Sequence, residues 1–386
     1  MKNRHVMMTR QIPVTRRQML QAAMAAGAAL PLCGVRLNAA EADAAVAKAP
    51  PLLHVTDLFH PHGDPDDHFD LAVTYALARR GAFDLRGVVI DYPPKFRAGD
   101  PAVVAVAQLN RLAGYSVPVS IGTSRHLKTR RDALRDAPDQ ETAAVRFICE
   151  QLRASPRPAA LMCVGSAADI VVAALREPGL FKEKCAGVYL NSGSAHDNPA
   201  KPGELEFNVR LDPVAYAAMF DLPCPLYWYP CWNTVELRES GTDGSFYWLQ
   251  HREALSGLSS GAANYFNHMF EKSSDPKWLR SMEASPTDTE AWKKMLDGRR
   301  GMWSTASQLT AAGLSVTKDG GIVPAAAAGG EAVFEMTPAE VACADDGRLT
   351  WKRVEAPNGR WMLRVTDAAR YPAAMTKAVA TLLNEL

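Results

Sequence analysis

The stretch T-D-L-F-H-P-H-G-D-P-D-D-H-F-D-L-A, residues 56–72, indicates the fold because it leads from a strand-like segment into a helix-like one. The segment before it, 52–56 (LLHVT), is apolar and typical of a buried strand. The segment 71–80 is typical of a helix. A buried strand followed closely by a helix begins a βαβ unit, from which parallel sheets are built.

The same alternation continues along the chain. Further strands are expected at 85–90, 117–121, 160–164, 187–190 and 225–229, with helices at 102–113, 142–153, 167–175 and 213–220. Strands separated by such helices predict right-handed crossovers and an α/β fold with a mainly parallel sheet flanked by helices. Ligands bind such sheets beyond the carboxyl ends of the strands, where Asp57, Asp91 and Asn191 fall.

The second half of the chain has a different pattern. Residues 244–310 are aromatic and helix-like without clear strands, and we expect a helical insertion that covers the site. The tail returns to strand-like runs with turns at 345–347 and 357–359, and it closes with a helix over 373–386. This pattern predicts a C-terminal β-meander plus helix. We expect residues 51–386 to form one domain.

The composition excludes several classes of protein. The chain has 386 residues, of which 47% are hydrophobic and 22% charged, which is typical of a globular protein and not of a disordered or coiled-coil chain. With 43 Lys+Arg and 42 Asp+Glu the net charge is +1, so the chain has no overall attraction for nucleic acid. We expect no nucleic-acid partner.

The first 42 residues carry six basic residues and one acidic residue. Arg16-Arg17 precedes an apolar run at 22–32, and Ala40-Glu41-Ala42 offers a small-residue cleavage step. This order predicts a twin-arginine-type export signal over 1–42, followed by a linker at 43–50. Because the apolar run is too short to span a bilayer, we expect a periplasmic or extracellular bacterial protein without membrane attachment after signal removal.

Residues 56–72 concentrate side chains that bind cations. They contain five aspartates and three histidines: Asp57, Asp64, Asp66, Asp67, Asp70, His60, His62 and His68. Crowded carboxylates repel one another unless a cation neutralises them, and Ca²⁺ or Mg²⁺ prefers several carboxylate oxygens at once. The histidines leave Zn²⁺ open. The alternative is an acidic loop whose aspartates cap the following helix, which accounts for one or two of them.

Four stretches in order resemble the inosine–uridine preferring nucleoside hydrolase family. The strand ending in T-D, followed by D-D at a helix start, resembles the metal motif of that family. The other three are L-M-C-V-G-S-A-A-D-I (161–170), V-Y-L-N-S-G-S-A (188–195) and E-F-N-V-R-L-D-P-V-A-Y (206–216), the most specific match. The resemblance covers about residues 52–230 and implies a nucleoside hydrolase-like fold.

The resemblance also implies roles for matching residues. The catalytic residues would be Asp57 and Asp67. Ca²⁺ would be bound by Asp57, Asp66, Asp67 and the main-chain carbonyl of Ala168. The ligand would be bound by Asn198, Glu206, Asn208 and Trp232. Asp57 would act as general base toward the attacking water, and one of the paired aspartates would hold ribose hydroxyls. Considered without the resemblance, Glu206 and Asn208 are better explained as residues that form loop hydrogen bonds before the helix at 213–220.

Departures from the family pattern leave two functions open. Eight residues separate Asp57 from Asp66, so Asp64 is a further candidate for either place. The late His-Asp-Pro element of the family is missing, and the comparable stretch is M-W-S-T-A-S-Q-L (302–309). The substitutes for its proton donor are His60, His62, His68 and His196.

The retained aspartates and E-F-N favour a metal-dependent hydrolase of N-ribosyl or other N-glycosidic bonds. The lost His-Asp-Pro favours a catalytically lapsed sugar- or nucleoside-binding protein on the same scaffold. Under both hypotheses the partner is a small nucleoside- or glycoside-like molecule, and a homo-oligomer remains open.

Overall fold

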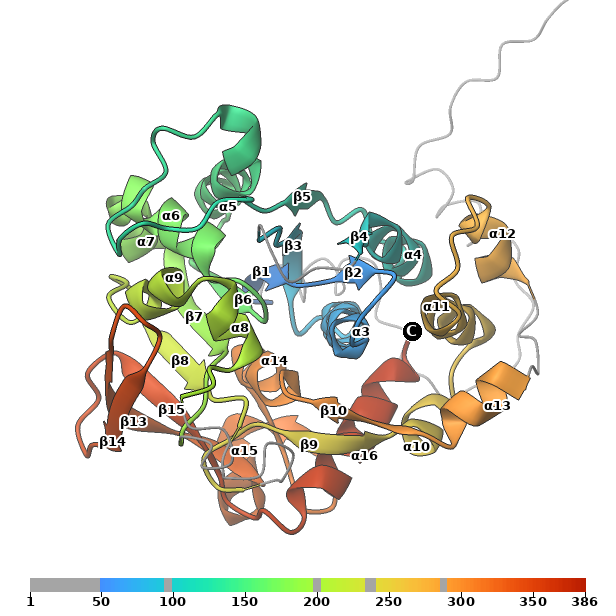
Figure 1. Cartoon of the computed structure of the whole chain (residues 1–386). Helices are drawn as coiled ribbons and strands as arrows, with labels where there is room; N and C mark the ends of the chain where they lie inside the picture. Colours follow the sequence, from blue (N-terminus) through green and yellow to red (C-terminus); the bar gives the residue numbers. More distant parts are fainter. Residues whose placement is uncertain (1–48, 94–98, 197–202, 233–240, 285–289) are drawn as a thin grey trace, which may run out of the picture. The chain divides into compact units, whose positions relative to one another are not determined.

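A nine-stranded sheet organises the described part of the chain (Figure 1). Its strands lie in the order β14 (Leu349–Arg353), β13 (Phe334–Cys343), β15 (Arg360–Val365), β8 (Leu226–Tyr229), β7 (Cys185–Asn191), β6 (Ala159–Cys163), β1 (Pro51–Thr56), β3 (Asp84–Ile90) and β5 (Val119–Ile121). Neighbouring strands from β15 to β5 run parallel, whereas β13 pairs antiparallel with β15 and β14. The predicted mainly parallel sheet is therefore confirmed.

The computed structural model describes residues 49–386 apart from 94–98, 197–202, 233–240 and 285–289. The predicted export signal and most of the predicted linker lie outside these residues. Asp43–Leu386 form one compact unit. Within the described ranges no helix is long and apolar enough to cross a membrane, and the six cysteines found there are buried free thiols.

Helices cover both faces of the sheet. One face carries α3 (Asp66–Arg79), α4 (Val103–Ala113), α11 (Ser260–Phe270), α14 (Thr305–Ala311) and α16 (Tyr371–Leu383). The other carries α5 (Ala143–Ala154), α6 (Ala168–Arg176), α7 (Pro178–Lys184) and α9 (Pro213–Met219). Shorter elements are α8 (Phe207–Leu211), α10 (His251–Leu255), α12 (Trp278–Glu283), α13 (Glu290–Leu296), α15 (Ala325–Ala328), η1 (Asp139–Thr142) and η2 (Gly329–Glu331).

Strand β1 shows how the sequence places the sheet at the centre. All six of its residues are buried. Leu52 packs into the core on one face of the sheet, and Leu53 and Val55 pack into the core on the other. Successive side chains of a strand point to opposite faces, so a strand covered by helices on both sides is mainly apolar. His54 and Thr56 are the buried polar residues of β1.

The insertion over residues 244–310 is mainly helical, as predicted, but it also contains strands that were not expected. β9 (Tyr247–Gln250) pairs antiparallel with β10 (Arg299–Met302). Two more short pairs are β2 (Phe59–His60) with β4 (Asp100–Pro101), and β11 (Leu314–Val316) with β12 (Ile322–Pro324). Such short strands have little periodicity of their own and are stabilised by partners distant in sequence.

Two predicted elements have different limits from those expected. The helix expected over 71–80 begins at Asp66, because the acidic residues Asp66 and Asp67 occupy its first turn, where the helix dipole favours negative charge. The C-terminal meander is present, but β15 also pairs with β8. The meander therefore extends the main sheet.

Candidate functional site

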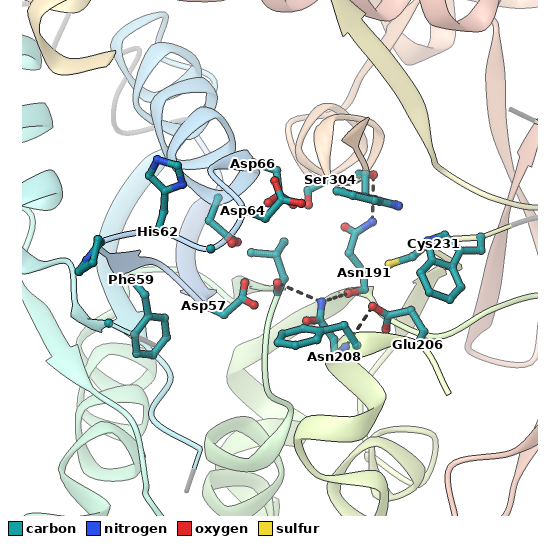
Figure 2. Close-up of a pocket in the computed structure, with 18 residues that line it drawn as sticks. Asp57, Phe59, His62, Asp64, Asp66, Asn191, Glu206, Asn208, Cys231 and Ser304 are labelled. Carbon is teal, nitrogen blue, oxygen red and sulfur yellow. Dashed lines mark hydrogen bonds between the residues drawn. The ribbon is translucent and has the colours of Figure 1, made fainter. Parts of the chain in front are cut away.

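A cavity of about 380 Å³ lies at the carboxyl ends of the parallel strands (Figure 2). Asp57 follows β1, Val164 follows β6 and Asn191 ends β7, and all three line the cavity. The lining also includes Phe59, His62, Asp64, Asp66, Asp67, Glu206, Phe207, Asn208, Cys231, Trp232, Trp303 and Ser304. This is the edge at which parallel sheets bind ligands. The segments at 57–67 and 206–208, predicted to form one site, meet here.

The carboxyl groups of Asp57 and Asp67 are in direct contact. The Oγ1 of Thr56 donates a hydrogen bond of 3.2 Å to Oδ1 of Asp67, and the Asp67 side chain is also hydrogen-bonded to Asp57. Asp67 is 7% exposed. Burial, followed by repulsion from Asp57 and Asp66, raises the pKa of Asp67 well above its ordinary value. Without a cation, these surroundings therefore favour the neutral form of the Asp67 carboxyl.

Helix capping does not explain the aspartates. The residue before α3 is Pro65, and no side chain caps the helix. Asp70 lies one turn further along, is 1% exposed, and has an Oδ1 without a hydrogen-bond partner in the described structure. Burial raises its pKa to about 7, although a hydrogen bond from Ser304 and the charge of Arg300 oppose this shift. Asp66 and Asp67 therefore make no side-chain cap of α3, although both lie in its first turn.

Asp64 does not replace Asp57 or Asp66 in the paired position. Its half-exposed carboxylate accepts hydrogen bonds from the Arg300 guanidinium, at 2.9 Å from Nη2 and 3.3 Å from Nη1. Burial, with repulsion from Asp64 next, raises the pKa of Asp66 well above its usual range, while Arg300 lowers it. Asp64 is therefore an ion-pair partner at the edge of the cavity.

The donor chemistry of this cluster fits a hard divalent cation. A cation beside Asp57 and Asp67 would relieve the repulsion between carboxylates that raises the pKa of Asp67. In the part of the chain that the structure describes, no three or more His, Cys, Asp or Glu side chains are arranged as a metal-binding group.

Glu206 and Asn208 lie at the cavity but are engaged in the local structure. The Glu206 carboxylate caps α8 and accepts hydrogen bonds from the backbone N–H groups of Gly193 at 2.8 Å and Asn208 at 3.0 Å. The Nδ2 of Asn208 donates to the carbonyl oxygens of Val164 and Asn191, both at 3.2 Å. These bonds use the amide nitrogen, so Oδ1 is the atom that Asn208 can offer to a ligand.

One predicted site residue lies away from the cavity, and the position of another is outside the described residues. Ala168 is the first residue of α6 and does not line the cavity. Val164, from the same strand–turn–helix segment, lines it instead. Asn198 lies outside the described residues. The predicted ligand residue Trp232 does line the cavity, together with Trp303 and Phe207. Aromatic faces of this kind stack on bases and sugars.

Only one of the four candidate proton donors lines the cavity among the described residues. His62 does so, and burial, followed by the charges of Lys272 and Arg300, lowers its pKa to about 4. His60 and His68 line a separate cavity of about 340 Å³. His196 lies near Asp243, with 3.3 Å between Nε2 and Oδ2.

The sequence analysis missed the contribution of the segment before α14. Trp303 and Ser304 line the cavity, and Ser304 is hydrogen-bonded to Asp70. The Nδ2 of Asn191 donates to the carbonyl of Trp303 at 3.1 Å, which ties this segment to the end of β7. The stretch 302–309 resembled the family position of His-Asp-Pro, but its own residue types indicated no binding role. Arg300 likewise had no sequence signal.

The comparisons with known proteins identify the family and the fold of the chain. Residues 63–318 match the family model of the inosine-uridine preferring nucleoside hydrolases. A purine-preferring ribonucleoside hydrolase from Gardnerella vaginalis has a similar structure, with a TM-score of 0.54 and 16% identity, covering 86% of this chain and 99% of that chain. The plant nucleoside hydrolase PpNRh1 gives a TM-score of 0.52 and 12% identity, with coverage of 86% and 99%.

A third solved structure is that of the type III effector XopQ complexed with adenosine diphosphate ribose. Its TM-score is 0.45 at 15% identity, with 88% of this chain and 98% of that chain covered. No match was found among the curated proteins. At these identities, the likeness to the solved structures concerns the fold alone.

Proposed function

Because the chain belongs to the inosine-uridine preferring nucleoside hydrolase family, we propose that it hydrolyses the N-glycosidic bond of a nucleoside-like compound. The observation that supports this most strongly is the convergence of Asp57, Asp67 and Asn208 on one cavity. Cleavage of such a bond passes through an oxocarbenium-like state, in which positive charge develops on the sugar. Carboxylates held beside the sugar stabilise that charge.

Each residue of the cavity would have a separate role in the reaction. Asp57 would accept a proton from the attacking water, whose oxygen bonds to the anomeric carbon as the bond to the base nitrogen breaks. Asp67 and the Oδ1 of Asn208 would hold sugar hydroxyls. Glu206 would act by positioning, because its carboxylate orders the backbone of Gly193 and Asn208. The departing base takes up a proton, and the products are free base and free sugar.

A divalent cation would be held by Asp57 and Asp67, with Asp66 beside them, and Ca²⁺ is the first candidate before Mg²⁺ and Zn²⁺. When bound, it would supply a positive charge that makes nearby water more acidic and orients the sugar hydroxyls. The two contacting carboxyl groups and the raised pKa of Asp67 support this part of the proposal.

A binding protein without catalysis is the second candidate, and the state of His62 favours it. A pKa of about 4 leaves this imidazole neutral near pH 7, so it is a weak proton donor for a departing base. Under this alternative the same cavity holds a sugar or nucleoside and releases it unchanged. We further propose that the protein is exported, on the basis of the Arg16-Arg17 leader.

One experiment separates the two candidates. The purified protein is incubated with purine and pyrimidine nucleosides and simple glycosides, with added Ca²⁺ and again after chelation, while released base and reducing sugar are measured. Base release that is lost on chelation supports the metal-dependent hydrolase. Saturable binding of an intact nucleoside without release supports the binding protein. Neither release nor binding contradicts both.

The aromatic wall gives a prediction for Trp232. Stacking of one base on an aromatic side chain contributes about 1–3 kcal/mol. Trp232→Ala should therefore raise KM for a nucleoside, or Kd for the binding protein, by about tenfold. Trp232→Phe retains an aromatic face and should stay within about threefold of the wild type. Equal losses in the two variants would show that the indole does not act by stacking.

A further inference from the structure

Arg300 is a buried cation beside the carboxylate cluster. It is 8% exposed, although arginine is almost never fully buried unless paired. Its guanidinium binds Asp64 and lies 5.3 Å from the centre of the Phe69 ring. Its charge also lowers the pKa of both Asp66 and Asp70. Arg300 therefore pairs with one of the five clustered aspartates and acts electrostatically on two others.

The alternation of β10 directs Arg300 toward the cluster and its neighbour away from it. Arg300 pairs with Leu249 of β9, and both Arg300 and Met302 are buried. Arg299 is exposed, and its guanidinium lies over the Trp248 ring at 4.2 Å. The two arginines therefore share a strand but point to opposite faces, so Arg299 is a matched control for Arg300.

We propose that Arg300 is the internal counter-ion of the carboxylate cluster and a positioning residue for its cation site. It pairs with Asp64, offsets the charge of Asp66 and Asp70, and leaves the Asp57–Asp67 pair as the position for one divalent cation. This inference rests on the metal-assisted part of the proposed function. It adds that the chain itself limits how strongly the cluster attracts that cation.

The physical basis is competition between two positive charges. A fixed guanidinium at the cluster repels an incoming cation, and the interaction is weakly screened because the group is buried. Loss of the guanidinium charge should increase the affinity for the cation. A residue that served only to pack Phe69 and close the loop at Asp64 would change stability but would not raise cation affinity.

The test measures Ca²⁺ binding by titration calorimetry at pH 8 on the full protein without nucleoside. For Arg300→Gln we expect a Kd for Ca²⁺ at least tenfold lower than that of the wild type. Arg300→Lys keeps the charge and should stay within threefold of the wild type, and Arg299→Gln should stay within twofold. An Arg300→Gln Kd that is unchanged or higher than that of the wild type overturns the proposal.

A second variant serves if Arg300→Gln does not fold. Asp64 has a half-exposed side chain, so Asp64→Asn should preserve the fold while leaving the guanidinium unpaired. We then expect the Kd for Ca²⁺ to rise between threefold and thirtyfold. An unchanged Kd would show that Arg300 does not act on the cation site. Complete loss of Ca²⁺ binding would show that Asp64 is itself a ligand of the cation. Each of these results contradicts the proposal.

The binding measurement is independent of turnover. If neither the wild type nor Arg300→Gln binds Ca²⁺, Mg²⁺ or Zn²⁺, the role assigned to Arg300 is wrong even where nucleosides are hydrolysed. If the expected change in Kd appears in a protein that releases no base, the Arg300 inference stands and the hydrolase proposal fails.

Discussion

Asp67→Ala is expected to lower kcat/KM for nucleoside hydrolysis by about 10³-fold or more, with the fold intact. The carboxylate of Asp67 contacts Asp57 at the cavity and would touch cation or sugar, so its loss removes a transition-state contact of several kcal/mol. The fold should tolerate the change, because burial and repulsion already oppose the charged form of Asp67. Steady-state kinetics, metal analysis and a thermal melt together measure the effect.

Asp169→Ala provides the matched control. Asp169 is also a buried aspartate in the first turn of a helix, and its Oδ1 accepts a hydrogen bond of 3.0 Å from the backbone N–H of Thr123. It does not line the cavity. We expect this variant to melt at a lower temperature with unchanged kcat/KM. If Asp67→Ala kept near-full turnover and metal content while melting lower, the placement of the site at residues 57–67 would be wrong.

The cation-free protein should lose about 4 kcal/mol of stability between pH 4 and pH 7 through Asp70 alone. The ordinary pKa of this carboxyl is 3.8, and burial raises it to about 7 in the folded protein. In this range the unfolded chain releases the proton and the folded protein keeps it. The folded state therefore binds more protons, and the free energy of unfolding falls as pH rises.

Urea unfolding in the presence of a chelator, repeated across this pH range, measures the slope. Asp70→Asn removes one titrating group and should reduce the loss of stability by its share of about 4 kcal/mol, while the raised carboxyls of Asp66 and Asp67 keep a part of the slope. The pKa of the Asp169 carboxyl is raised to about 6. Asp169→Asn should therefore remove a smaller part of the pH-dependent loss of stability, and that part should lie at lower pH. Added Ca²⁺ should restore stability near pH 7, because a cation beside the cluster favours the ionised carboxylates. A slope that Asp70→Asn leaves unchanged would contradict the assignment.

The partner of Asp64 is a feature of the site that the sequence could not predict. Five aspartates between a strand and a helix predict a cation-binding edge, but they do not show which carboxylates meet. In the folded chain Asp64 turns to Arg300, which lies far along the sequence on β10, while Asp67 turns to Asp57. Pairing between distant segments depends on the path of the whole chain, so no local pattern in residues 56–72 contains it.

Glu206 illustrates the opposite case. Its carboxylate caps α8, which is the local role that an acidic residue before a short helix indicates by itself. The same residue lines the cavity. The E-F-N pattern therefore predicted the position of the segment. The structure shows in addition that the side chains of Glu206 and Asn208 form hydrogen bonds with the backbone around the cavity.

The sequence by itself determined the parallel sheet and the edge at which the site lies. Apolar runs such as 52–56 must be covered on both faces, and the ends of parallel strands bring Asp57 and Asn191 to one edge. Only the tertiary structure decided which residues complete that edge. Arg300, Trp303 and Ser304 come from an insertion whose short strands depend on partners far away in sequence. Their positions follow from packing, because local residue preferences are too weak to specify them.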